Sequence, residues 1–422
     1  MAFSISPLLA NSAIICVLLV LFESHRDAAA ATGYNCYKSI INFGDSLADT
    51  GNFIRMSNPE NKGATPPYGE TFFHRPTGRF SDGRLIIDFI ARSLGLPFLR
   101  PYLSAENGEE ESNFEKGVNF AVAGATALHI SFFEERGIVN DMTNTSLGTQ
   151  LDWFQKSFCN NIHSTDCKEK MQSSLVMMGE IGGNDYNYAF FQGFPREEIS
   201  SFVPKVISTI SSAITKLIEF GARSIVVPGN LPIGCIPVYL SYYMSSNQSD
   251  YDSSTGCINW LNEFSMYHNE QLERELSRLR ELHPNTTIIY ADYYNAAMEL
   301  YSSPTKYGKF PAPISNFYLL HFTSQSSLIL NLCYLNGFIG FKNTLSACCG
   351  AGGPYNYDAD AECGLESRVC DEPSSFVSWD GVHSTEAAYE VIAQGLLHGP
   401  YTSPRVNGLC ILEGSRFQIS DH

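Results

Sequence analysis

Short apolar runs rich in β-branched residues alternate with amphipathic helical patterns along most of this chain. This alternation predicts a parallel sheet covered by helices on both faces, a three-layer α/β/α arrangement. In such a sheet the ligand site lies beyond the carboxyl ends of the strands. The predicted strands are Ser39–Phe43, Ser174–Met178, Ser224–Val227 and Thr287–Tyr290, and the predicted helices are Leu85–Leu94, Val203–Phe220, Asn259–Leu282 and Thr385–Leu397.

Two polar residues lie just past the ends of predicted strands. Ser46 comes after the first strand, within Phe43-Gly44-Asp45-Ser46-Leu47. Asn184 comes after the second, within Gly182-Gly183-Asn184-Asp185. Both are expected at the edge of the sheet where ligands bind. The simpler alternatives are that Ser46 caps a helical turn and that Asn184 is a turn residue beside two glycines.

A carboxylate and an imidazole lie three residues apart near the other end of the chain, in Trp379-Asp380-Gly381-Val382-His383. A serine hydroxyl becomes a good nucleophile when a base takes its proton and a third group orients that base. We therefore predict that Ser46 is a nucleophile, His383 its general base and Asp380 the group that orients His383. The alternative role for Asp380 is to cap the helix that begins near Thr385.

Three donors are predicted to stabilise an oxyanion: the backbone N–H groups of Ser46 and Gly124 and the side-chain amide of Asn184. The block Gly117–Thr126 is rich in small residues, which let the backbone approach a ligand closely. Gly117 competes with Gly124 for this role. Each such donor is worth about 3–4 kcal/mol of barrier. Asp45 and Asp185 are expected to fix the loops rather than to act chemically.

The four blocks Phe43–Leu47, Gly117–Thr126, Gly182–Asp185 and Trp379–His383 follow one another in this order along the chain. Together they resemble the GDSL esterase/lipase family, also called SGNH hydrolases. The resemblance runs from about Ser39 to about Gly395. Asp49–Asn52, Pro76–Arg84 and Cys348–Gly350 resemble the plant branch in particular, and within it the group of acetylajmalan and sinapine esterases. The resemblance implies a flavodoxin-like fold and hydrolysis of small acyl or phenolic esters of plant metabolites through an acyl-enzyme, without a cofactor. The G-x-S-x-G motif of α/β-hydrolases is missing around Ser46, which argues against that fold.

The sequence leaves three alternatives to ester hydrolysis of this kind. The first is acyl transfer to another alcohol with the same triad, the second is a long-chain lipase, and the third is a non-catalytic binding protein. The intact Ser46, Asp380 and His383 argue against the third. We expect a small-molecule ester as the ligand, no protein partner, and no metal, since no Cys-x-x-Cys pairs with another at zinc spacing. A formal net charge of −17 disfavours nucleic acid, whose phosphates need a basic surface.

The amino terminus is typical of a secretory signal peptide, predicted over residues 1–31. Pro7–Phe22 is an apolar core and Ala28–Ala31 supplies small residues for cleavage. The core is shorter than the ~20 apolar residues that span a bilayer, so no stable membrane anchor is expected. The predicted destination is the extracellular space, with the cell wall or the vacuole as possible sites.

Cysteines and sequons agree with export. Disulfides are expected within Cys159/Cys167, Cys235/Cys257 and the cluster Cys348, Cys349, Cys363 and Cys370, whose connectivity the sequence leaves open. Asn144, Asn247 and Asn285 each begin an Asn-x-Ser/Thr sequon and are candidate glycosylation sites.

The remainder is predicted to be one domain, residues 32–402, followed by a tail, residues 403–422. Within it, Lys309–Gly340 departs from the family, in which the preceding Tyr-Gly would run almost directly into Cys-Cys-Gly. The segment has one Lys, no Asp or Glu, and many Phe, Leu, Ile, Tyr and Ser residues, as translated uridine-rich intron sequence would have. Gly308-Lys309 can be encoded by GGTAAG, which contains a splice-donor signal. Ile339-Gly340 can be encoded by ATAGG and one further base, which contains an acceptor AG. The two signals share a codon phase. We predict a retained intron; the alternative is a genuine surface insertion.

Overall fold

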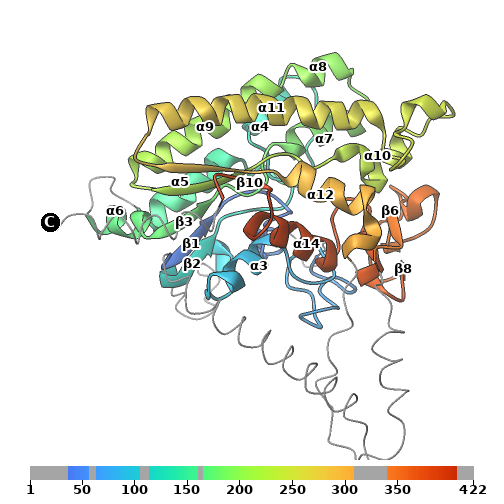
Figure 1. The fold of residues 1–422 in the computed structure, drawn as a ribbon, viewed down its shortest axis with the longest axis horizontal. Coiled ribbons are helices and arrows are strands. Elements are labelled where there is room, and N and C mark those ends of the chain that lie inside the picture. The colour runs from blue at the N-terminus through green and yellow to red at the C-terminus, as the bar shows by residue number, and fades with distance from the viewer. Residues whose placement is uncertain (1–36, 57–62, 105–113, 160–164, 308–339, 406–422) are drawn as a thin grey trace, which may run out of the picture.

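The computed structural model describes residues 37–56, 63–104, 114–159, 165–307 and 340–405 (Figure 1). Its central sheet has the strand order β10-β5-β4-β3-β1-β2. All neighbours are parallel except β10, which runs antiparallel to β5. The strands are β1 (Ser39–Asn42), β2 (Gly117–Asn119), β3 (Ser174–Met177), β4 (Ser224–Pro228), β5 (Thr287–Ala291) and β10 (Thr402–Ser403).

The predicted parallel sheet is therefore confirmed, and its order is that of a flavodoxin-like fold. The four predicted strands appear as β1, β3, β4 and β5, each within one residue of its predicted ends. The strand order reverses at β1, which lies between β2 and β3. In open α/β sheets a ligand binds beyond the carboxyl ends of the strands at such a reversal. The chain reaches this place directly after β1 and again after β3.

Side chains alternate along the strands and enter two separate cores, one on each face of the sheet. Ile41, Val176 and Ile225 pack in one core with α5, α9 and α11. Their neighbours Ile40 and Leu175 pack in the other with α3, α12 and α14. These helices are α5 (Leu147–Ser157), α9 (Val203–Glu219), α11 (Asn259–Leu282), α3 (Ile86–Ser93), α12 (Tyr293–Ser302) and α14 (Glu386–Leu397), and they form the two outer layers in Figure 1.

The four predicted helices are thus present as α3, α9, α11 and α14. In α9 the residues at helical spacing, Val206, Ile210, Ile214 and Leu217, are all buried, as the pattern predicted. The remaining α-helices of the described ranges are α2 (Phe53–Met56), α4 (Ile130–Glu134), α6 (Thr165–Gln172), α7 (Gly183–Phe191), α8 (Arg196–Ser200) and α10 (Pro237–Tyr242). None of the helices in the described ranges is both long and apolar enough to cross a membrane.

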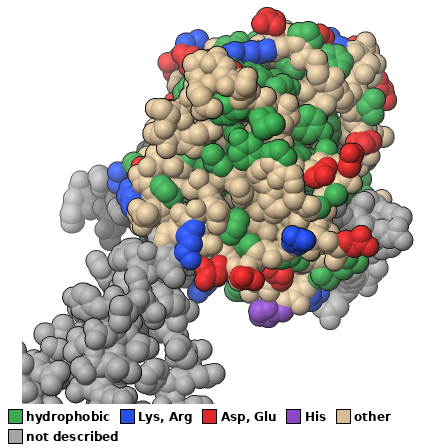
Figure 2. Space-filling view, turned by 90° about the vertical axis from the view of Figure 1, so that its right-hand side faces the viewer, with side chains coloured by type: hydrophobic (Ala, Val, Ile, Leu, Met, Phe, Trp, Pro, Cys, Tyr) green, Lys and Arg blue, Asp and Glu red, His purple; other side chains and the backbone are tan. Residues whose placement is uncertain are grey.

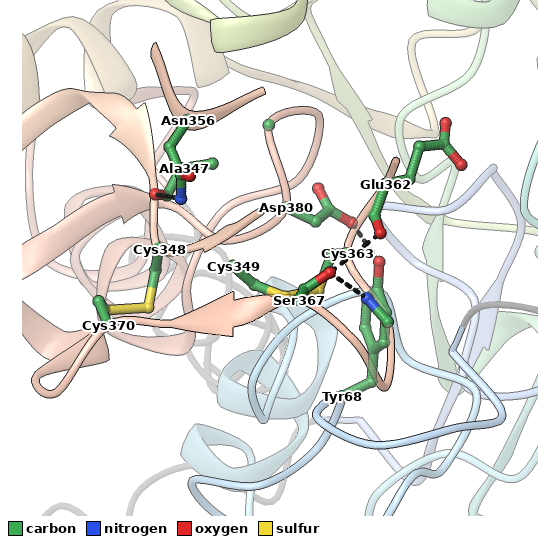
Figure 3. The surroundings of a disulfide bond; sticks show 12 residues. Tyr68, Ala347, Cys348, Cys349, Asn356, Glu362, Cys363, Ser367, Cys370 and Asp380 are labelled. Atoms are coloured by element: carbon green, nitrogen blue, oxygen red, sulfur yellow. Dashed lines mark hydrogen bonds between the residues drawn. A yellow bond between two sulfur atoms is a disulfide. The ribbon is translucent and has the colours of Figure 1, made fainter. Parts of the chain in front are cut away.

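A small disulfide-bonded region precedes α14. β6 (Asn343–Ala347) pairs with β9 (Phe376–Ser378), and β7 (Cys349–Gly350) pairs with β8 (Arg368–Val369). Cys348 is bonded to Cys370 and Cys349 to Cys363, as Figure 3 shows. Two further disulfides in the described ranges are Cys159–Cys167 and Cys235–Cys257. The expected pairs are confirmed, and the connectivity of the cluster, which the sequence left open, is now defined.

Several predictions from the sequence fall outside the described residues. The predicted signal peptide and nearly all of the predicted retained intron are among them. The described residues stop at Tyr307 and resume at Gly340. There the Phe341 N–H donates to Pro304 O at 2.9 Å, so the two flanks of the segment meet.

Candidate active site

Ser46 lies in a tight turn that directly follows β1. The Asp45 N–H donates to Glu180 O at 2.9 Å, and Asp45 Oδ1 accepts the Leu47 N–H at 2.9 Å. Gly44 has a φ of +131°, and a Cβ there would lie 2.9 Å from Glu180 O, so the loops after β1 and β3 approach too closely for a side chain. In the described residues no helix begins at Ser46, because the next one is α2. The alternative role of Ser46 as a helix cap therefore finds no helix at this position.

The structure brings Ser46, His383 and Asp380 into one hydrogen-bonded chain. His383 Nε2 lies 2.8 Å from Ser46 Oγ, and His383 Nδ1 lies 2.7 Å from Asp380 Oδ2. These residues come from opposite ends of the chain. The helix after His383 is capped by Thr385, whose side chain accepts the Ala388 N–H. Asp380 is therefore not the helix cap that the alternative assumed.

The Asp380 carboxylate is buried yet ionised. Its Oδ1 accepts the backbone N–H groups of Val382 at 3.0 Å and of His383 at 2.7 Å. Burial acts to raise the pKa of Asp380, but the neighbouring His383 and these hydrogen bonds outweigh it and lower the pKa to about 2. The carboxylate is thus charged at any pH at which a neutral imidazole could act as a base.

Asn184 stands in the first turn of α7, with its amide held on both sides. Its Nδ2 donates to Asp45 Oδ2 at 3.0 Å and to Ala125 O at 3.1 Å. Its Oδ1 accepts from Asn187 Nδ2 at 3.3 Å, and the Tyr239 hydroxyl in turn donates to Asn187 Oδ1. These contacts orient the NH₂ group of Asn184 toward the loops that carry Ser46 and Gly124. An oxyanion bound by this amide would replace one of its two present acceptors.

Two backbone donors near Ser46 have no partner within the described residues: the N–H groups of Ser46 and of Gly124. The Gly124 loop is tied to the Ser46 turn, since the Val122 N–H donates to Gly44 O at 3.1 Å. Gly124 has a φ of +79°, and its carbonyl accepts the Tyr188 hydroxyl at 2.8 Å. Gly117, the competing glycine, lies in β2, where a Cβ would come within 2.3 Å of Ile40 O. Its small size serves strand packing.

Three buried acids lie behind these loops. Asp45 and Glu180 lie close enough to interact electrostatically, and burial raises the pKa of both. Asp185 accepts the N–H groups of Ala127 at 2.7 Å and Leu128 at 2.9 Å. Burial raises the pKa of Asp185 to about 7 despite these bonds. Asp45 and Asp185 were predicted to fix the loops. Glu180 was not predicted, although its position just after a buried strand indicates a place at the same edge of the sheet.

Tyr68 was also missed. Its hydroxyl donates to Asp380 Oδ2 at 2.8 Å, from a loop more than 300 residues away along the chain. No spacing or motif in the sequence connects the two residues. In the described part of the chain, no group of three or more His, Cys, Asp or Glu side chains is placed to hold a metal ion.

The face at the carboxyl edge of the sheet is apolar at its centre. β4 and β5 lead toward α10 and α12 on the right-hand side of Figure 1, and Figure 2 looks onto this side. Hydrophobic side chains gather in its upper half, while most Asp and Glu side chains lie toward its edges. The three sequon asparagines, Asn144, Asn247 and Asn285, are all exposed.

The chain is similar to known proteins over most of its length. The family model of the GDSL-like lipase/acylhydrolases matches residues 40–396. The GDSL esterase/lipase At1g28580 of Arabidopsis thaliana is 48% identical over 418 residues, which cover 98% of each chain. The sinapine esterase of Brassica napus is 46% identical over 401 residues, 93% of this chain and 94% of that protein. The GDSL esterase/lipase At1g28570 of Arabidopsis thaliana is 51% identical over 379 residues, 89% of this chain and 88% of that protein.

Proposed function

The chain belongs to the GDSL lipase/acylhydrolase family of carboxylic ester hydrolases, and we propose that it cleaves small acyl or phenolic esters through an acyl-enzyme on Ser46. The observation that carries this proposal is the continuous contact from Ser46 Oγ through His383 to Asp380. It provides a nucleophile, a base within hydrogen-bond reach and a charged group that orients the base.

The first half of the reaction forms the acyl-enzyme. His383 Nε2 takes the Ser46 proton as Oγ attacks the ester carbonyl carbon. The negative charge that develops on the carbonyl oxygen meets the N–H groups of Ser46 and Gly124 and the Asn184 amide. The C–O bond to the alcohol then breaks, and the alcohol leaves with the proton from His383 Nε2.

The second half releases the acid. A water molecule gives a proton to His383 as it attacks the acyl-enzyme carbonyl, and the same three donors again meet the oxyanion. Collapse of this intermediate breaks the bond to Ser46 Oγ, which recovers its proton from His383. Asp380 stays ionised throughout and balances the charge of the imidazolium in both halves.

We further propose that the protein is secreted. The four disulfides found within the described residues suit an oxidising compartment. The exposed sequons at Asn144, Asn247 and Asn285 suit glycosylation on the export route. The name of the Brassica napus relative supports a sinapoyl ester as one test substrate.

A substrate screen tests the proposal. Secreted, purified protein is assayed against acetyl, butyryl, long-chain acyl and sinapoyl esters, with and without an added acceptor alcohol. We expect hydrolysis of the short or phenolic esters, with free acid as the main product. Dominant transfer to the alcohol would identify an acyltransferase, preference for long chains a lipase, and no turnover of any ester would overturn the proposed substrate class.

A further inference from the structure

The hydroxyl of Tyr68 is directed at the carboxylate that orients the catalytic imidazole (Figure 3). It donates to Asp380 Oδ2, the same oxygen that accepts from His383 Nδ1. Within the part of the chain that the structure describes, Asp380 accepts four hydrogen bonds, two at each oxygen, and Tyr68 supplies the one that comes from outside the Asp380–His383 loop. The side chain is 2% exposed, so the contact is shielded from solvent.

Packing leaves Tyr68 little freedom to point elsewhere. Its ring packs edge-on against Trp379, with centroids 6.1 Å apart, and against Phe80, with centroids 5.9 Å apart. Phe80 also contacts the His383 ring, at a centroid distance of 4.9 Å. The next residue, Gly69, donates its N–H to Ser81 O at 3.0 Å. Asp82 links the Tyr68 loop to the start of α14. Its carbonyl oxygen accepts the Thr71 N–H from the loop, and its Oδ1 accepts the Glu386 N–H from the helix.

The Tyr68 hydroxyl acts only as a donor in this position. Burial, and then the charge of Asp380, raise the pKa of Tyr68 well above its usual value. The hydroxyl therefore keeps its proton at every pH at which the triad can act. The charge of Asp380 also acts on two further tyrosines, Tyr357 and Tyr389, and the charge of Asp45 acts on Tyr389. Tyr357 and Tyr389 also have raised pKa values through burial and stay neutral, and Asp45 lies on the Ser46 side.

We propose that Tyr68 is a positioning residue for the ester hydrolysis proposed above, acting on His383 through Asp380. It holds Oδ2 in line with His383 Nδ1, and it spreads the negative charge of that oxygen. Loss of the hydroxyl concentrates the charge facing His383, which then holds its proton more tightly. The imidazole becomes neutral only at higher pH, and it is also less firmly oriented.

The test compares Tyr68→Phe with the wild type and with Tyr243→Phe. The control removes a tyrosine hydroxyl that donates to Phe190 O at 2.7 Å and that contacts no member of the triad. The values of kcat and KM are measured between about pH 5 and 9, which spans the titration of a histidine. For Tyr68→Phe we expect kcat to fall roughly tenfold, as loss of a hydrogen bond to a charged group would cause. The acidic limb should move to higher pH while KM stays nearly unchanged, and Tyr243→Phe should show neither change.

An NMR titration of His383 gives a readout that does not need turnover. In Tyr68→Phe the His383 signals should change at higher pH than in the wild type. An unmoved titration, or a loss of thermal stability alone with the pH profile of the wild type, would show that Tyr68 only packs. If the wild type proves inactive on every ester, the proposed function fails, and the NMR result still decides whether Tyr68 acts on the Asp380–His383 pair.

Discussion

At the scale of single residues, the amide of Asn184 is the group whose present contacts and proposed role differ most. Both of its N–H bonds are used in the resting site, on Asp45 and on Ala125. Each of these acceptors also keeps the amide close to where an oxyanion would form. The site is thus preorganised around Asn184, and one hydrogen bond is exchanged rather than created during the reaction.

Replacement of this amide should therefore affect the rate and not the affinity. For Asn184→Ala we expect kcat to fall about 10²–10³-fold, with a much smaller change in KM, because the lost donor acts on charge present only in the transition state. Steady-state kinetics on the best ester of the screen measures both constants. A rise in KM with kcat preserved would place Asn184 in ground-state binding instead.

At the scale of elements, the sequence predicted those parts whose signals are local. β1, β3, β4 and β5 are continuous apolar runs, and α9 shows a clear helical period, so each was found within a residue or two. β2 was not predicted, because its three residues start with a glycine and lie in a block that resembles a ligand loop. Ser46, Asp380 and His383 could be assigned roles from their motifs, whereas Tyr68 and Glu180 reach the site only through tertiary packing.

The disulfide-bonded region next to the catalytic loop is an element that the structure ties directly to the site. The Cys349 N–H donates to Trp379 O at 2.7 Å, and the Cys348 N–H donates to Ser378 O at 3.0 Å. The segment that leads to Asp380 is thus held by two cysteines, each of which forms a disulfide with a later cysteine, Cys348 with Cys370 and Cys349 with Cys363. The Cys159–Cys167 disulfide instead joins the end of α5 to α6.

This difference predicts unequal effects of two double variants. Removal of the Cys349–Cys363 bond, as Cys349→Ser/Cys363→Ser, should cost about 2–4 kcal/mol of stability and also lower kcat. The matched pair Cys159→Ser/Cys167→Ser should lower stability with little effect on kcat. Thermal unfolding and kinetics of both variants test this. Equal kcat values in the two would show that the Cys349–Cys363 bond does not position Asp380.

At the scale of the whole molecule, the buried acids make stability depend on pH. The pKa of Asp185 is about 7 in the folded chain against 3.8 for the free group. Between these values the folded state holds a proton that the unfolded state has lost, so the free energy of unfolding falls as the pH rises through this window. Asp45 and Glu180 act in the same direction. Asp380, with a lowered pKa, contributes stability that is constant above about pH 4.

We accordingly expect the melting temperature to fall by several degrees between about pH 4.5 and 7.5, the window set by these pKa values. Asp185→Asn, which is neutral at every pH, should flatten the decline. Asp360→Asn, at an exposed position, should leave it unchanged. Calorimetry at both pH values measures the slopes, and a slope for Asp185→Asn equal to that of the wild type would refute the assignment.

The flanks of Lys309–Gly340 bear on whether the functional chain contains this segment. The Phe341 N–H reaches Pro304 O, and a Cβ at Gly340 would lie 2.4 Å from the same oxygen. If Gly308 were joined directly to Phe341, Phe341 would follow Pro304 by five residues with a glycine just before it. That spacing is the one in which a helix ends with a six-to-one hydrogen bond and a glycine.

A chain that lacks Lys309–Gly340 should therefore fold with the same core and keep its esterase activity. Expression of this deletion beside the full chain, with melting temperature and kcat as readouts, tests the structural part. Sequencing of the mature transcript tests the origin of the segment. Reads that run uninterrupted through these codons in the dominant message, or a deletion that fails to fold, would contradict the retained intron.

Ser46 is proposed to carry the acyl group, and direct detection of the acyl-enzyme tests this role best. The protein is mixed with a good ester substrate, quenched in acid within the first turnovers, digested and analysed by mass spectrometry. We predict one acyl group on the peptide that contains Ser46, and neither this label nor activity above a small residue in a folded, secreted Ser46→Ala variant. An acyl group on another residue, or Ser46→Ala activity within about tenfold of the wild type, would contradict the account.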